Sequence, residues 1–234
     1  MQSRKKLPGT DDNPKSPQPN DPALAAALQG LIGEMAYADN TRPYALVIAG
    51  PNGAGKSTLT RDVINEVGIS VVDPDQLAKV LPPDSTGLND LMVQKLLNDY
   101  RQIYAKAGKS LAYETVFSDP IGAKLLELKS MQDAGYRIYF VYVGLSSAQL
   151  SRARVLHRVT NGGHGVDVSK LSRRFEASLA NGAALAKIAN MTILVDNSSH
   201  DTPHRFVACL KRGVVISRAE VVPKWTESFL TENQ

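Results

Sequence analysis

Apolar residues along the chain alternate between short continuous runs and stretches with helical spacing. Strands alternating with helices in this way are typical of a mostly parallel sheet with helices on both faces. The pattern therefore predicts an α/β fold of three layers. The strand-like runs lie at 44–49, 69–72, 110–113, 137–143 and 191–195.

The stretches between these runs carry the end signals of helices. Helices are predicted over 58–67, 88–105, 121–134 and 169–189, and Gly135 stands where a glycine C-cap would end the third. A further helix is predicted to open at Ser146, because Gln149 follows at the capping-box spacing. In the 88–105 helix the apolar residues are expected on one stripe: Leu88, Met92, Leu96, Tyr100 and Ile103 or Tyr104.

Three segments frame this body of the chain. Residues 1–22 hold five of the 13 prolines among polar residues, which predicts a disordered tail. An N-terminal helix is expected within 23–40, because apolar residues recur there at helical spacing. Residues 41–234 then form one domain, which ends in a hairpin (205–210 with 214–217) and a closing helix at 225–230.

Composition excludes several classes of protein. The chain has 234 residues, a net charge of +4 and 43% hydrophobic residues, as expected of a globular domain. Its apolar runs are far shorter than the roughly 20 residues of a membrane span, and none follows the basic N-terminus as in a secretory signal. We expect a cytoplasmic protein that does not contact the membrane. Cys209 is the single cysteine, which excludes an internal disulfide and a cysteine-rich metal site.

Positive charge is concentrated in one segment. Residues 152–174 hold six basic residues and one acid, a local charge of +5, whereas the rest of the chain is close to neutral. Such a local feature suits a small anionic ligand and argues against nucleic acid as a partner. A solvated helix face is the alternative interpretation.

A phosphate-binding loop follows the first strand. The sequence there fits the Walker A pattern Gly-x-x-x-x-Gly-Lys-Ser/Thr, between a strand and a helix as that motif requires. Its glycines let consecutive backbone N–H groups face one anion, Lys56 would reach the β- and γ-phosphates, and the Ser57 hydroxyl would ligate Mg²⁺. The sequence thus predicts that ATP and Mg²⁺ bind a P-loop NTPase or kinase fold. The loop residues are Gly50, Pro51, Asn52, Gly53, Ala54, Gly55, Lys56, Ser57 and Thr58.

Carboxylates follow two of the other strands. Asp73 and Asp75 come after the 69–72 strand, which we expect beside the P-loop strand, and Glu114 ends the next one. Open α/β sheets bind ligands at the carboxyl ends of their strands. A carboxylate that takes the proton of a hydroxyl acceptor indicates a kinase rather than an NTPase. Because Pro74 holds Asp73 extended, Asp75 is the better candidate base, although either aspartate could simply cap the next helix.

The basic segment predicts a helical lid at about 152–174. Arg154 and Arg158 lie one helical turn apart, and Arg173 and Arg174 begin the next helix beyond the glycine-rich link at 161–165. Closure of such a lid would bring guanidinium groups onto the transferring phosphoryl group and exclude water.

Taken together, these motifs resemble the zeta-toxin family. The resemblance covers roughly residues 44–225 and includes the P-loop, Asp73-Pro-Asp75, Glu114-Thr-Val-Phe-Ser118, the lid and Asp196-Asn-Ser198. It implies a P-loop kinase fold: a three-layer sandwich with a mostly parallel sheet, a helical lid and a small C-terminal hairpin. Characterised toxins of the family use ATP and Mg²⁺ to phosphorylate the sugar 3′-hydroxyl of UDP-N-acetylglucosamine, which blocks cell-wall synthesis.

The resemblance also implies roles for single residues. Lys56 and Ser57 match the phosphate and Mg²⁺ positions, and Asp75 matches the catalytic base. Glu114 and Thr115 match the substrate-side motif. Arg158 and Arg174 are the best matches for the lid arginines that contact ATP, with Arg154 and Arg173 close by. Asp196 and Asn197 stand where such kinases often line the adenine pocket, and a cognate antitoxin is implied as a partner.

Three functions remain open on sequence. The first is a kinase of a UDP-sugar or a similar metabolite. The second is a nucleoside or polynucleotide kinase, against which stand the confined basic charge and an aromatic content of only 6%. The third is a P-loop ATP-binding switch that transfers no phosphoryl group.

Overall fold

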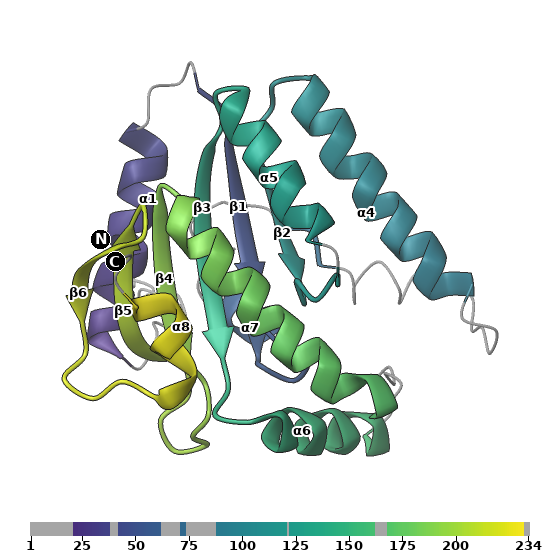
Figure 1. The fold of residues 1–234 in the computed structure, drawn as a ribbon, viewed down its shortest axis with the longest axis vertical. Helices are drawn as coiled ribbons and strands as arrows, with labels where there is room; N and C mark the ends of the chain where they lie inside the picture. Colours follow the sequence, from purple (N-terminus) through teal and green to yellow (C-terminus); the bar gives the residue numbers. More distant parts are fainter. Residues whose placement is uncertain are drawn as a thin grey trace, which may run out of the picture.

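A computed structural model describes residues 21–37, 42–61, 71–73, 88–120, 122–161 and 168–231. Its sheet is built from β1 (Tyr44–Ala49), β2 (Leu111–Thr115), β3 (Arg137–Gly144), β4 (Met191–Asp196), β5 (Arg205–Lys211) and β6 (Val214–Arg218). The strands lie in the order β2-β1-β3-β4-β5-β6 (Figure 1). Strands β1 to β4 pair in parallel, and β5 and β6 are antiparallel. The predicted parallel sheet and C-terminal hairpin are confirmed.

The central strands are apolar on both faces, as buried parallel strands are. In β3, Phe140 and Tyr142 belong to one core cluster, whereas Tyr139, Val141 and Val143 belong to the other. A continuous apolar strand therefore packs against helices on both faces of the sheet.

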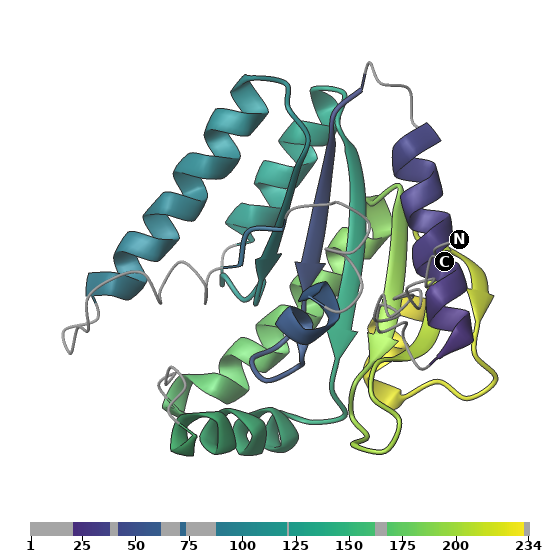
Figure 2. The same cartoon turned by 180° about the vertical axis from the view of Figure 1, so that it is seen from behind.

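Helices cover both faces of the sheet. The helices α5 (Ala123–Asp133), α7 (Leu171–Ile188) and α8 (Glu227–Leu230) lie on the face seen in Figure 1, with α4 (Leu88–Lys106) beyond α5. The helices α1 (Pro22–Tyr37) and α2 (Lys56–Leu59) lie on the opposite face (Figure 2). Helix α6 (Ala148–Thr160) crosses below the carboxyl ends of the strands. Short 3₁₀ turns at Val168–Lys170 and Lys224–Thr226 precede α7 and α8. No helix in the described ranges is long and apolar enough to cross a membrane.

The predicted N-terminal helix packs on the sheet. Leu24, Leu28 and Leu31 of α1 are buried in the cluster that also contains residues of β4 and β5. Asp21 Oδ1 accepts a hydrogen bond from Ala23 N (2.8 Å), and Asp21 Oδ2 accepts one from Phe206 N (2.7 Å). A single carboxylate therefore caps the helix and joins it to β5.

The stripe predicted for the helix of residues 88–105 is wrong in part: Tyr100 and Tyr104 pack against the core, but three other residues do not. Met92, Leu96 and Ile103 are 51%, 48% and 63% exposed, whereas Val93 and Leu97, one position further along, are buried against Val72. This helix is apolar on two adjacent faces, so its spacing alone did not decide which face meets the sheet.

Three smaller expectations also need correction. Residues 71–73 do not lie beside the P-loop strand: Val72 pairs in parallel with Tyr113 of β2, and β2 separates it from β1. The N-cap of α6 is Ser147 rather than Ser146, because the Ser147 hydroxyl accepts the hydrogen bond from Leu150 N at 3.1 Å. The disordered tail predicted at 1–22 is wrong at its end, because Asp21 caps α1 and Pro22 begins it. The rest of that tail and residues 162–165 of the predicted glycine-rich link lie outside the described residues.

Candidate functional site

The Walker A residues form a tight loop between β1 and α2. Gly53 and Gly55 have φ values of 72° and 85°, a backbone region that favours glycine. Lys56 Nζ donates to the carbonyl oxygens of Gly50 (2.9 Å) and Pro51 (3.1 Å), so the ammonium lies across the loop. Thr58 is exposed on the first turn of α2. The geometry is that of an anion-binding loop at a helix N-terminus.

Helix α6 of the predicted lid packs directly on this loop. The Ser151 hydroxyl donates to Asn52 O at 2.6 Å, and an Arg154 guanidinium nitrogen lies 3.5 Å from Gly53 O. Burial lowers the pKa of Arg154, and the charge of Asp196 opposes that shift. Arg154, which the sequence analysis placed second to Arg158, thus lies at the loop backbone. Arg158 is half-buried one turn further along α6.

A buried carboxylate lies beside the predicted Mg²⁺ ligand. The Ser57 hydroxyl donates to Glu114 Oε2 at 2.8 Å, and Glu114 is only 3% exposed near the end of β2. Burial raises the pKa of Glu114, and the nearby Asp73 raises it further, whereas Thr60, Lys56 and Ser57 lower it. The structure therefore brings together the predicted residues Ser57, Lys56 and Glu114.

Hydroxyl and carboxylate oxygens are the ligands that Mg²⁺ takes in proteins. Ser57 and Glu114 supply both, and Asp73 lies close enough to Glu114 to raise its pKa. The donor set fits the predicted cation. Asp75, the predicted base, lies outside the described residues, two positions beyond Asp73.

Thr115 anchors the backbone that follows Glu114. Its hydroxyl oxygen accepts hydrogen bonds from Phe117 N and from Lys124 Nζ, both at 3.1 Å. Phe117 is fully buried with φ at 57°, an uncommon conformation for such a residue. Helix α7 holds this turn, since Asn181 Nδ2 donates to Phe117 O and to Asp119 O, both at 3.0 Å. The Thr115 hydroxyl is thus used for local structure at the edge of the site.

Lys124 connects this turn to a polar cavity between α4 and α5. Burial lowers the pKa of Lys124, and the positive charges of Arg101 and Arg174 lower it further. Arg101 is 4% exposed, bonds Glu127 through Nε at 3.0 Å and stacks over the ring of Tyr113. The cavity has a volume of about 340 Å³ and is lined by Gln94, Asn98, Arg101, Gln102, Asp119, Ala123, Lys124 and Glu127.

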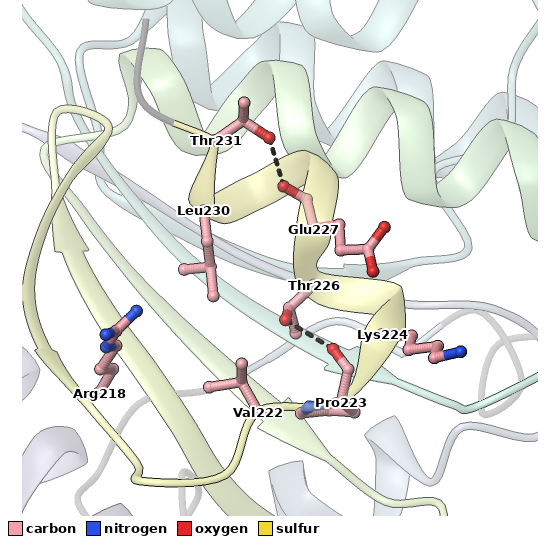
Figure 3. Close-up of a pocket in the computed structure, with 8 residues that line it drawn as sticks. All are labelled: Arg218, Val222, Pro223, Lys224, Thr226, Glu227, Leu230 and Thr231. Carbon is pink, nitrogen blue, oxygen red and sulfur yellow. Dashed lines mark hydrogen bonds between the residues drawn. The ribbon is translucent and has the colours of Figure 1, made fainter.

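A second cavity of about 350 Å³ lies between β6 and α8 (Figure 3). Predicted site residues line neither cavity, but Lys124 at the cavity between α4 and α5 bonds Thr115, which is one of them. Its hydroxyls are already bonded to backbone, Thr226 to Pro223 O at 2.7 Å and Thr231 to Glu227 O at 2.5 Å. The candidate site is therefore the P-loop with the neighbouring α4–α5 cavity.

A family model described as zeta toxin matches residues 31–202. The chain belongs to the zeta toxin family. An uncharacterized protein of Haemophilus influenzae is 27% identical over 121 residues, which are 51% of this chain and 84% of that protein.

Solved structures share the P-loop kinase fold of this zeta toxin family member. The PezAT toxin–antitoxin system of Streptococcus pneumoniae matches with a TM-score of 0.50 at 17% identity, over 77% of this chain and 78% of that one. The AvrRxo1-ORF1:AvrRxo1-ORF2 complex with sulphate ions matches with a TM-score of 0.57 at 15% identity, over 89% and 69%. The same complex with ATP matches with a TM-score of 0.55 at 17% identity, over 82% and 65%. Family and fold together make the protein a kinase.

Sequence reasoning missed several residues of this zeta toxin family site. Lys124 and Arg101 were not singled out, because a basic residue on an amphipathic helix is ordinarily solvated. His204 was not singled out either, and it contacts the P-loop at Gly55 O (3.0 Å). Asn197, which was expected at the adenine pocket from its position after a parallel strand, also bonds the P-loop at Ala54 O (2.8 Å).

Proposed function

We propose that this protein is an ATP- and Mg²⁺-dependent kinase that phosphorylates a hydroxyl of a UDP-sugar such as UDP-N-acetylglucosamine. The observation that carries the proposal is the hydrogen bond of 2.8 Å between the Ser57 hydroxyl and the buried Glu114 carboxylate, directly after the P-loop. A P-loop Ser/Thr holds Mg²⁺ in kinases and NTPases, and a carboxylate beside it orients that hydroxyl or the water on the metal.

The P-loop and the lid are proposed to bind the phosphates of ATP. The N–H groups of the loop and the Lys56 ammonium would bind the phosphates, with Ser57 and Glu114 holding Mg²⁺. The bound metal neutralises charge that develops on the transferring phosphoryl group. Arg158 and Arg174 are proposed to approach that group from the lid, and Arg154 already lies beside Gly53 O.

Asp75 is proposed as the base that accepts the proton of the acceptor hydroxyl. Asp73, two residues before it, lies near Glu114, which supports a second carboxylate on the acceptor side of Mg²⁺. Proton acceptance by a positioned carboxylate helps transfer to a hydroxyl group and would do nothing for simple nucleotide binding.

The polar lining of the cavity between α4 and α5 is evidence for a polar acceptor. Its walls carry amides, two cations and two carboxylates, groups that bond hydroxyls, a pyrophosphate and an N-acetyl group. A volume of about 340 Å³ lies within the range of small-molecule sites. Lys124 links the cavity to Thr115, so the acceptor site is proposed to extend from this cavity to the end of β2.

An antitoxin is proposed as a protein partner. Two similar structures are a toxin–antitoxin system and the AvrRxo1-ORF1:AvrRxo1-ORF2 complex. Their likeness to this chain supports a protein partner of this kind.

An acceptor panel tests the proposal. The purified protein is incubated with Mg²⁺-ATP and, separately, with UDP-sugars, nucleosides and oligonucleotides, and mass spectrometry detects products heavier by one phosphoryl group. We expect a phosphorylated UDP-sugar with the wild type and none with Asp75→Asn, which should still bind ATP. Asp73→Asn is the matched control, because it removes the neighbouring carboxylate. Phosphorylation of nucleosides or oligonucleotides alone would replace the proposed acceptor, and no product with any acceptor would contradict the proposal.

A further inference from the structure

Two side chains from the loop between β4 and β5 bond carbonyl oxygens on one side of the P-loop, which we call its outer side. Asn197 Nδ2 donates to Ala54 O at 2.8 Å, and His204 Nε2 lies 3.0 Å from Gly55 O. Because a carbonyl oxygen only accepts, this His204 nitrogen carries the proton. The resemblance places Asn197 at the adenine pocket, and His204 has no role in the nucleotide chemistry described so far.

The two side chains form one unit with each other and with the sheet. Asn197 Oδ1 accepts a hydrogen bond from His204 N at 3.2 Å, and Asn197 N donates to Gly144 O at the end of β3 at 3.0 Å. His204 has φ at 52°, a left-handed conformation in which histidine is enriched among non-glycine residues. Asn197 is 7% exposed, so its amide is directed into the protein.

In a planar trans peptide, the C=O of one residue and the N–H of the next point in opposite directions. Bonds that fix Ala54 O and Gly55 O on the outer side therefore fix the N–H groups of Gly55 and Lys56 on the inner side. Those N–H groups belong to the set with which a P-loop binds phosphate oxygens. Within the P-loop and α2, Lys56 Nζ bonds Gly50 O and Pro51 O, and Leu59 N bonds Gly55 O at 3.1 Å. Asn197 and His204 add a bond at Ala54 O and a second bond at Gly55 O.

We propose that Asn197 and His204 are positioning residues that hold the P-loop N–H groups ready for the phosphates of ATP. The inference rests on the proposed nucleotide binding and assigns Asn197 to the loop rather than to the adenine base. Gly55 supports it, because a Cβ there would lie 2.4 Å from Asn197 Nδ2 and 3.1 Å from His204 Nε2. Glycine at this position leaves room for both donors.

Binding of Mg²⁺-tripolyphosphate separates this role from contact with adenine, because the probe carries phosphates and no base. Affinities for tripolyphosphate and for ATP are measured by calorimetry with the wild type, His204→Asn and His204→Gln. Asparagine tolerates the left-handed backbone but is too short to reach Gly55 O, whereas glutamine keeps a donor at a similar reach. Melting temperatures of the variants are recorded alongside.

We expect His204→Asn to lower the affinities for ATP and for tripolyphosphate by the same factor, about 5- to 10-fold, as for the loss of one net hydrogen bond. His204→Gln should bind within about twofold of the wild type, and Asn197→Ala should repeat the loss. At saturating ATP, kcat should change little, because the phosphates are bound equally in ground and transition states.

The inference is overturned if ATP binding weakens while tripolyphosphate binding does not, which would place His204 at the base. It is also overturned if glutamine fails to restore affinity, or if neither variant changes it. A wild type that binds no ATP is a separate result, since it removes the proposed function and this inference with it.

Discussion

Replacement of Gly55 by alanine tests the packing around the P-loop, and Gly108→Ala provides the matched control. Both glycines have positive φ, 85° and 60°, so both alanines carry the cost of a left-handed backbone, about 1–2 kcal/mol. A Cβ at Gly108 would have no heavy atom within 4 Å, whereas one at Gly55 would lie 2.4 Å from Asn197 Nδ2. The difference between the two variants therefore isolates the contact with Asn197.

The added cost at Gly55 follows from the hydrogen bonds that Asn197 would lose. Its side chain must move, which breaks the bond to Ala54 O and disturbs the one from His204 N. At about 1 kcal/mol net for each bond, we expect Gly55→Ala to lower the free energy of unfolding by about 2 kcal/mol more than Gly108→Ala does.

Urea denaturation of the two variants and the wild type measures these free energies. In an Asn197→Ala background the extra cost of Gly55→Ala should shrink, because the two residues share the lost contact. Equal destabilisation by Gly55→Ala and Gly108→Ala would refute the reasoning, since the backbone cost alone would then explain both.

Four further predictions concern three side chains. Glu114→Gln should weaken Mg²⁺ binding about 10- to 100-fold, measured by calorimetry with ATP present, and an unchanged affinity would remove Glu114 from the metal site. Burial raises the pKa of Glu114 above its usual 4.5, so its contribution to stability is present at low pH and is lost as pH rises through the raised pKa. The melting temperature of Glu114→Gln relative to the wild type should therefore rise as pH increases above 4.5, until the raised pKa is passed. Lys124→Met should raise KM for the acceptor more than tenfold, as for loss of a charged hydrogen bond of about 1.5–3 kcal/mol, and a matching rise in KM for ATP would contradict its place on the acceptor side. Burial raises the pKa of the Cys209 thiol to about 11, so a thiol reagent at pH 8 should label the native protein far more slowly than the protein in urea, and equal rates would contradict the burial.

The sequence predicted those parts of the site that depend on local order. The P-loop follows β1 because an apolar run, three glycines and Lys56 are consecutive in the chain. Glu114 was expected at the ligand-binding edge of the sheet because it ends an apolar run. In the structure its Oε2 accepts a hydrogen bond of 2.8 Å from the Ser57 hydroxyl. Both conclusions needed only the rule that parallel strands share a carboxyl edge.

The parts that failed depend on contacts between distant segments. Spacing could not decide between the two apolar faces of α4, and the core received Val93 and Leu97 rather than Met92 and Leu96. The local sequence pattern does not determine the order of strands in a sheet either. The position of β2 between Val72 and β1 was therefore not predicted.

The side-chain bonds to the P-loop were not predicted for the same reason: Asn197 was expected at the adenine pocket, and His204 was not singled out. Asn197 lies 143 positions from Ala54, and His204 lies 149 positions from Gly55. No periodicity connects residues so far apart. Their contribution became visible only when the fold placed the β4–β5 loop against the P-loop.

Coupling between ATP consumption and acceptor phosphorylation tests the central claim most directly. ADP and phosphorylated UDP-N-acetylglucosamine are quantified in the same reaction, with and without the acceptor, and with Asp75→Asn as the inactive control. The account predicts one ADP for each phosphorylated acceptor and little ADP without it, because transfer needs a hydroxyl beside the base. ADP that accumulates at the same rate in both reactions, with no phosphorylated acceptor, would contradict it.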